Sequence, residues 1–420
     1  MKVKIYPGFA KGQVKIPPSK SFLHRAIICA SLAKGTSIIK NVIYSDDVKA
    51  TIEAFKTIGV KIEKQENSLR VIGYGRLFFL GEEKIDCNES GTTLRFLTPL
   101  FTNDKGIYLT GKSTLLSRPM SIYENVFKEK NLIFDKSETG YFLKGELPSG
   151  TYEVDGNISS QFISGLLLTL PLKTSDSKII IKGDFESAKY TELTIDVMRN
   201  FGVNITKTDY GYYIEGNQLY KPTNYKVEAD CSQLAFFAVG GILNGDIKIS
   251  NINLNSLQPD SQITNIIKKM NGRIVKEKSY LRFVKSQTNG MNIDVSQCPD
   301  IAPILSVLGA LSLGVTKIEN ASRLKIKETD RLWAINNILQ KFGVKTTVKE
   351  DSYIVSGQNV LSGNEFNSYN DHRMVMSIAI ASLRSDKPVI IEDYLVVNKS
   401  YPSFFEDLAS LGIKIEYIEE

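Results

Sequence analysis

Residues 55–73, FKTIGVKIEKQENSLRVIG, contain the pattern that decides the fold. A helix-like segment ends at Gly59, and two short strand-like runs follow around a turn. Glycine, and less often asparagine, adopts the left-handed conformation that ends a helix. This stretch therefore predicts an amphipathic helix followed by a β-hairpin.

The same pattern recurs along the whole chain of 420 residues. The spacings between the helix-ending residues are 72, 71, 70, 71 and 69, and 420/6 is 70. Small solenoid repeats are nearer 20–50 residues, so we expect six modules grouped into two compact lobes that divide near residue 227. The helix-ending residues are Gly59, Asn131, Gly202, Gly272, Gly343 and Gly412.

Each module also contains a second helix that is apolar on all sides, as in residues 162–170, 234–243, 304–313 and 374–383. A helix with no polar face should be buried. Each module is thus predicted to have an exposed helix, a buried helix and a few strands, which defines an α/β (α+β) protein.

Composition excludes several classes of protein. Lys+Arg exceed Asp+Glu by 52 − 46 = 6, which is too mild to indicate a nucleic-acid partner. Two His cannot build a His-rich metal site, and four Cys without a C-x-x-C pair argue against structural zinc. No apolar segment resembles a secretory signal or a membrane span, so we expect a cytoplasmic location.

Polar residues precede the apolar helices, in segments 18–21, 89–92, 157–161, 230–232, 298–300 and 370–373. Helix capping explains most of them. Capping does not explain Lys20, Arg25, Arg95 and Arg373, because a cation in the first turns opposes the helix dipole unless an anion is present. If these helices converge, the protein has a cleft for substrates with several negative charges.

Two further segments have competing interpretations. Residues 106–113, GIYLTGKS, match the phosphate-loop pattern, but residues 107–110 are strand-like, which argues against a flexible loop. Residues 327–331, KETDR, are typical of a solvated helix start in which Asp330 or Thr329 caps the helix 331–341. Capping leaves the pair of cations around Glu328 unexplained.

Eight segments together resemble the 5-enolpyruvylshikimate-3-phosphate (EPSP) synthase family. The strings KETDRL and YNDHRM are the most specific, and the matches run in family order from residue 15 to residue 407. The segments are 18–25 (PSKSFLHR), 90–95 (SGTTLR), 117–119 (SRP), 159–161 (SSQ), 299–300 (PD), 327–332 (KETDRL), 369–374 (YNDHRM) and Lys399.

The resemblance implies a two-lobed inside-out α/β barrel with three modules in each lobe. One lobe would comprise residues 1–14 and 227–420, the other residues 15–226, with the active site in the cleft between them. It also implies transfer of the enolpyruvyl group of phosphoenolpyruvate to the 5-hydroxyl of shikimate 3-phosphate, in the biosynthesis of aromatic amino acids through chorismate.

The resemblance also implies the binding residues. Those for shikimate 3-phosphate are Lys20, Ser21, Arg25, Ser159, Ser160, Gln161, Ser187, Tyr190, Asp300 and Lys327. Those for phosphoenolpyruvate are Lys20, Gly91, Arg118, Gln161, Arg331, Arg373 and Lys399. Arg offers bidentate donors and Lys a point charge to phosphates and carboxylates, and Gly91 lets backbone approach a ligand.

We expect Asp300 to remove the hydroxyl proton and Glu328 to protonate the methylene carbon, with Lys20 as a rival donor. Glu89 and Arg323 stand where relatives commonly have Asn, and both are left out of the expected site. We expect no metal, no organic cofactor, no nucleic-acid or membrane partner, and a monomer.

Three other functions remain as alternatives. A UDP-N-acetylglucosamine carboxyvinyltransferase uses a Cys-bearing loop, whereas residues 112–117, KSTLLS, have no Cys. A non-catalytic phosphometabolite- or RNA-binding protein would need a basic stripe with interleaved aromatic residues. A nucleotide hydrolase depends only on the pattern at 106–113.

Overall fold

The computed structural model describes residues 1–79, 81–278 and 280–419. The chain forms two compact units. Unit 1 comprises Met1–Pro17 and Ala229–Glu420, and unit 2 comprises Pro18–Glu228. The chain therefore passes between units at residues 17/18 and 228/229, a few residues beyond the boundaries expected from the sequence.

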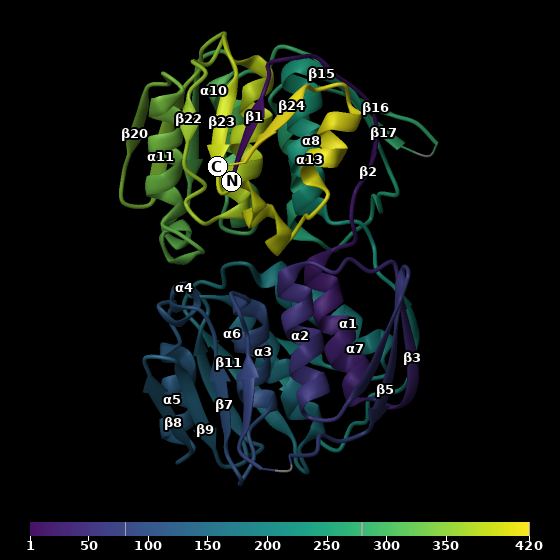
Figure 1. Ribbon diagram of the computed structural model, residues 1–420. Coiled ribbons are helices and arrows are strands. Elements are labelled where there is room, and N and C mark those ends of the chain that lie inside the picture. Colours follow the sequence, from purple (N-terminus) through teal and green to yellow (C-terminus); the bar gives the residue numbers. More distant parts are fainter. Residues whose placement is uncertain (80, 279, 420) are drawn as a thin grey trace. The chain divides into compact units, whose positions relative to one another are not determined.

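Six sheets of four strands share one topology (Figure 1). The first strand is parallel to the second, and the remaining pairs are antiparallel. The sheets of unit 2 are β14(Asn224–Lys226)-β3(Lys34–Lys40)-β5(Ser68–Tyr74)-β4(Lys61–Gln65), β6(Glu83–Asp86)-β7(Ile107–Thr110)-β9(Gly140–Lys144)-β8(Ile133–Ser137) and β10(Thr151–Asp155)-β11(Ser177–Lys182)-β13(Gly211–Ile214)-β12(Thr206–Thr208).

The three sheets of unit 1 repeat this order. They are β2(Ala10–Lys15)-β15(Gly245–Ser250)-β17(Tyr280–Val284)-β16(Arg273–Lys276), β18(Asn292–Asp294)-β19(Val315–Glu319)-β21(Ser352–Ser356)-β20(Thr346–Val348) and β22(Glu365–Phe366)-β23(Val389–Glu392)-β1(Lys2–Ile5)-β24(Ile415–Ile418). Six sheets of identical order confirm the prediction of six modules.

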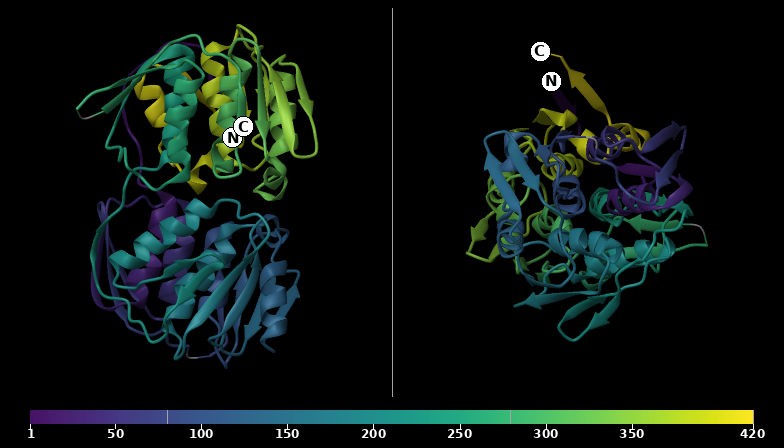
Figure 2. Two further views of the ribbon diagram at one scale, coloured as in Figure 1. Left: turned by 180° about the vertical axis from the view of Figure 1, so that it is seen from behind. Right: turned by 90° about the horizontal axis from the view of Figure 1, so that it is seen from below.

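Each module has one largely buried helix and one outer helix, as predicted. Figure 2 shows the helices and sheets of each unit from two further sides. The buried helices are α1 (Lys20–Leu32), α3 (Gly91–Leu100), α6 (Ser160–Thr169), α8 (Cys231–Asn244), α10 (Ala302–Ala310) and α12 (His372–Ala381). The outer helices are α2 (Asp46–Thr57), α5 (Ser121–Glu129), α7 (Ala188–Asn200), α9 (Ile263–Lys269), α11 (Arg331–Lys341) and α13 (Phe404–Ser410). The short α4 (Ser113–Leu116) follows β7.

Two details of the predicted repeat are wrong. In the fourth module the left-handed residue is Asn271 (φ 69°), not Gly272. Gly272 is needed for its size, because a Cβ there would lie 2.5 Å from Ile267 Cγ2. The sixth module has only β24 after Gly412, and the N-terminal strand β1 supplies its hairpin partner, pairing Val3 with Tyr417.

The segment 106–113 is not a phosphate loop. Ile107–Thr110 forms β7, a central strand of its sheet, so these residues cannot wrap a phosphate. Among the described residues, no helix is long and apolar enough to cross a membrane.

Candidate active site

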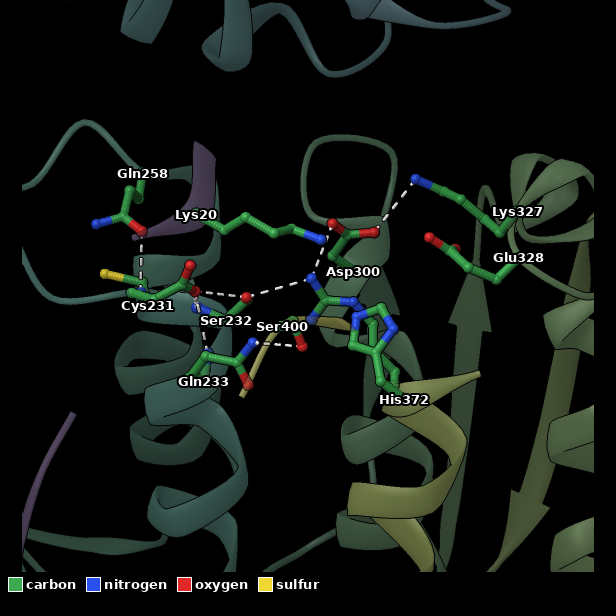
Figure 3. A network of polar contacts seen from close by, with 12 residues as sticks. Lys20, Cys231, Ser232, Gln233, Gln258, Asp300, Lys327, Glu328, His372 and Ser400 are labelled. Atoms are coloured by element: carbon green, nitrogen blue, oxygen red, sulfur yellow. Dashed lines mark hydrogen bonds and ion pairs between the residues drawn. The ribbon is translucent and has the colours of Figure 1, made fainter. Parts of the chain in front are cut away.

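Five charged side chains of unit 1, Asp300, Lys327, Glu328, Arg331 and Arg373, form a cluster here called the Asp300 cluster. Figure 3 shows Asp300, Lys327 and Glu328 of this cluster. The Asp300 carboxylate accepts from Lys327 Nζ (3.2 Å), Arg331 Nη1 (3.1 Å) and Arg373 Nη2 (3.1 Å). Glu328 Oε2 accepts from Arg331 Nη2 at 2.8 Å. The structure thus brings together all five residues that the sequence assigned to this part of the site.

Helix starts place these side chains. Asp300 lies in the turn η3 (Pro299–Ile301) that leads into α10, and Arg373 is the second residue of α12. Arg373 Nη2 also donates to Ser232 Oγ (3.2 Å) at the start of α8. The N-terminal ends of the three buried helices of unit 1 therefore converge on one cationic region, where N–H groups and the helix dipoles favour anions.

Asp371 binds two of the arginines of the cluster. Its carboxylate accepts from Arg331 Nε at 2.7 Å and, as the N-cap of α12, from the backbone N–H of Arg373 at 2.8 Å. Asp371 is 0% and Arg331 1% exposed. Burial opposes the charge on Arg331, but Asp371, Glu328 and Asp300 outweigh it and hold its pKa above the usual range. Arg331 is a fixed cation.

Opposing effects act on the Asp300 carboxyl. Burial alone would raise its pKa, but Arg373, Lys327 and Arg331 hold the pKa well below its usual range. For Lys327, burial lowers the pKa, and Asp300 opposes this shift. Asp300 therefore carries a negative charge at neutral pH and compensates three cations.

Unit 2 brings Gly91, Arg118 and Gln161 together at the starts of α3 and α6. A Cβ on Gly91 would lie 3.0 Å from Arg118 Nη1 and 3.8 Å from Gln161 Oε1. Gln161 accepts from Arg95 Nη1 (2.8 Å) and donates to Thr92 Oγ1 (2.9 Å). Arg118 and Gln161 thus place hydrogen-bond donors beside Gly91, which has no side chain.

The predicted residues of α1 lie in two different environments. Lys20 Nζ forms an ion pair with Asp47 Oδ2 at 2.7 Å. The Arg25 guanidinium donates to the carbonyls of Ser21 (2.7 Å) and Tyr190 (3.2 Å). Burial lowers the pKa of Arg25 to about 10, so it remains charged at neutral pH. Ser21, Arg25 and Tyr190 are thus brought together between α1 and α7.

Other predicted residues lie at helix ends. Ser159 caps α6 by accepting from the Gln161 N–H, and Ser160 is buried in its first turn. Ser187 has a left-handed backbone (φ 54°) before α7. Lys399 is buried at the end of η6 (Tyr394–Lys399).

The site expected from the sequence left out several partners of its residues, although Arg95 was among the cations noted at helix starts. Asp47 binds Lys20, Arg95 binds Gln161, and Asp371 binds Arg331. Arg95 and Asp371 lie inside the recognised segments 90–95 and 369–374, which was the available signal. Asp47 gave no such signal, because its pairing with Lys20 depends on how α2 packs against α1.

His24 links the helix starts of unit 2 through a buried chain of hydroxyls. Its Nδ1 lies 2.7 Å from Thr51 Oγ1, which lies 2.7 Å from Thr93 Oγ1, and Thr93 donates to Ser90 Oγ at 2.7 Å. Burial lowers the pKa of His24 to about 3. The ring is therefore neutral and serves to orient α1 against α3.

We expect the His24 imidazole to remain neutral from pH 8 to pH 5. An unfolded histidine has a pKa of about 6.5. Below that pH the unfolded state binds a proton at His24 that the folded state does not bind. The free energy of unfolding therefore decreases as the pH falls from about 6.5 toward 3. NMR of 15N-labelled histidines checks this, with a His24→Phe variant to assign the signal. A midpoint near pH 6.5 would contradict the assignment of a neutral buried ring.

The fold is similar to those of two solved enolpyruvyl transferases. The EPSP synthase of Acinetobacter baumannii has a TM-score of 0.82 and 25% sequence identity, covering 99% of this chain and 100% of that chain. The enolpyruvyl transferase NikO of Streptomyces tendae has a TM-score of 0.79 at 14% identity, covering 99% and 98%. The second likeness concerns the fold alone.

The chain belongs to the EPSP synthase (3-phosphoshikimate 1-carboxyvinyltransferase) family, whose profile matches residues 7–408. It is similar to the 3-phosphoshikimate 1-carboxyvinyltransferase of Clostridium novyi, with 44% identity over 98% of this chain and 97% of the relative. The enzyme of the same name from Clostridioides difficile is 45% identical over 99% and 98%.

Proposed function

We propose that the protein transfers the enolpyruvyl group of phosphoenolpyruvate to the 5-hydroxyl of shikimate 3-phosphate and releases phosphate. The observation that carries the proposal is the Asp300 cluster, where one carboxylate lies within 3.2 Å of Lys327, Arg331 and Arg373. Two substrates that each carry a phosphate and a carboxylate match this concentration of cations.

Asp300 acts as the general base in this proposal. Free of substrate it is a weak base, because three cations stabilise its charge. Anionic substrates that engage Lys327, Arg331 and Arg373 reduce this stabilisation and so increase the basicity of Asp300. Asp300 then accepts the proton of the 5-hydroxyl while the hydroxyl oxygen bonds to C2 of phosphoenolpyruvate.

The methylene carbon of phosphoenolpyruvate gains a proton in the same addition. Glu328 is the proposed donor, and its carboxylate must first take up a proton because it accepts from Arg331 in an ion pair. Lys20, the rival donor, is held by Asp47. In the elimination, the Glu328 carboxylate takes back a proton from the new methyl group as the C–O bond to phosphate breaks and phosphate departs.

The cysteines argue against the UDP-N-acetylglucosamine alternative. All four are buried, and burial raises the pKa of the thiols of Cys29 and Cys87. A buried thiol of raised pKa is a poor proton donor to a substrate carbon.

Phosphate release with two acceptors of the enolpyruvyl group, and with ATP alone, tests the proposal. Phosphoenolpyruvate with shikimate 3-phosphate is expected to release phosphate, whereas phosphoenolpyruvate with UDP-N-acetylglucosamine, and ATP alone, are not. No release with the shikimate ester would overturn the proposal, and release from ATP alone would favour the nucleotide hydrolase.

Gly91→Ala is expected to raise the KM for phosphoenolpyruvate by about tenfold, equivalent to about 1.4 kcal/mol. The new Cβ would press on Arg118 Nη1 at 3.0 Å, and the guanidinium must move. Steady-state kinetics with each substrate varied checks this, and the KM for shikimate 3-phosphate should change less. The control is Gly81→Ala, where a Cβ meets nothing within 4 Å; equal effects of both changes would refute the explanation.

A further inference from the structure

A cavity lies in unit 2, at the opposite end of α1 from Lys20. Its volume is about 680 Å³, and Leu32, the last residue of α1, forms part of its wall. At 1.5 Å per residue, Leu32 lies about 18 Å along the helix from Lys20. Nothing assigned to the substrates above lines this cavity, and its volume is in the range of small-molecule sites.

Three cations line the cavity, and no acidic residue does. They are Lys34, Arg76 and Lys221. Among the described residues, none of the three lies within 4 Å of a carboxylate oxygen, in contrast to the Asp300 cluster. Their charges add in a concave site with low-dielectric walls, which attracts anions.

Aromatic and aliphatic side chains form the rest of the wall. The Arg76 guanidinium lies 4.6 Å over the Phe78 ring, and the Tyr74 ring meets Phe78 edge-on at 6.3 Å. Both rings are more than 40% exposed, and Leu219 is 68% exposed. Such grouped apolar exposure is typical of a binding surface rather than of a solvated loop.

Backbone pairing holds the walls in place. Lys34 and Tyr74 are paired across β3 and β5, so their side chains are neighbours on one face. Gly75 (φ 77°) follows directly, and a Cβ there would lie 3.0 Å from Lys34 Cβ. On the other wall, the Lys221 N–H donates to the Phe201 carbonyl at 2.7 Å, and Tyr220 OH donates to Leu168 O at 2.9 Å. These contacts fix the backbone on both sides of the cavity.

We propose that this cavity binds a small organic anion that carries a flat apolar ring, such as an aryl carboxylate. The ring would lie against Tyr74, Phe78 and Leu219, and the anionic group would lie among Lys34, Arg76 and Lys221. An inorganic anion would leave the apolar wall unused, and a neutral aromatic molecule would leave the cations uncompensated.

Calorimetric titration of the whole protein with 3-phenylpropionate, in saturating shikimate 3-phosphate, tests this site. Saturable binding is expected. Propionate, which lacks the ring, and 3-phenylpropanol, which lacks the charge, should bind at least about tenfold more weakly, or about 1.4 kcal/mol. Absence of saturable binding, or equal binding of the three compounds, would overturn the proposal.

Arg76→Gln and Phe78→Ala are each expected to weaken 3-phenylpropionate binding about fivefold or more, with enzymatic turnover unchanged. Both side chains are exposed, so the variants should fold. Lys84→Gln, an exposed lysine of β6 outside the cavity, is the matched control and should bind as the wild type does. Binding that survives both cavity variants would place the probe elsewhere and refute the assignment.

Discussion

Replacing Asp300 with asparagine is expected to lower kcat by about 10²–10⁴-fold while shikimate 3-phosphate still binds. Asparagine keeps the shape of the side chain but cannot accept the hydroxyl proton. The change also removes the carboxylate shared by Lys327, Arg331 and Arg373, and the freed cations should bind an anionic substrate at least as tightly as before. Phosphate release and calorimetric titration with shikimate 3-phosphate measure the two effects separately.

Asp330→Asn is the matched control for this experiment. Asp330 caps α11 by accepting from the Trp333 N–H at 3.0 Å, and asparagine caps a helix about as well. The control should therefore keep wild-type turnover. A kcat of Asp300→Asn close to that of the control, or loss of shikimate 3-phosphate binding in a folded Asp300→Asn protein, would remove Asp300 from the role of base.

Arg331→Met is expected to destabilise unit 1 by about 3–5 kcal/mol, because it leaves buried carboxylates without their cation. The guanidinium donates through Nε, Nη1 and Nη2 to Asp371, Asp300 and Glu328. Asp371 is wholly buried and cannot turn to water. Lysine offers no such fork, so Arg331→Lys should also be destabilising.

Amide hydrogen exchange measures this destabilisation region by region. Protection in α10 and α12, which lie beside Arg331, should fall. Protection in α1 and α3 of unit 2 serves as the internal control and should be retained. Lys341→Met, at the exposed end of the same helix, is the matched variant and should leave protection unchanged. A loss below about 1 kcal/mol in Arg331→Met would show that the cluster tolerates unpaired charge.

The sequence predicted the modules because helix termination is local. The end of the first outer helix involves only the six residues from Phe55 to Val60, because the Val60 N–H donates to the Phe55 carbonyl across Gly59. Such a helix end can be recognised from the local sequence alone. The failures concern what is not local. Strand β1 completes the sheet of the last module, and β2 and β14 pair with strands far along the chain. No hydrophobic pattern indicates which distant strand will be the partner.

The same distinction holds for the candidate site. Lys20 and Arg373 were identified from the sequence because cations at helix starts are unfavourable without an anion. Their present anionic partners are the protein's own carboxylates, Asp47 and Asp300. Asp300 was predicted as a base, yet its role as the shared counter-ion of three cations depends on the convergence of separate helices and required the structure.

The most direct test of the proposed function is 31P NMR of the wild-type protein mixed with equimolar phosphoenolpyruvate and shikimate 3-phosphate. We expect the phosphoenolpyruvate signal to fall while inorganic phosphate and a new phosphomonoester signal of the enolpyruvyl ether rise in equal amounts. We also expect that no phosphate appears when shikimate 3-phosphate is omitted. Phosphate released without the shikimate ester, or phosphate without the ether product, would contradict enolpyruvyl transfer.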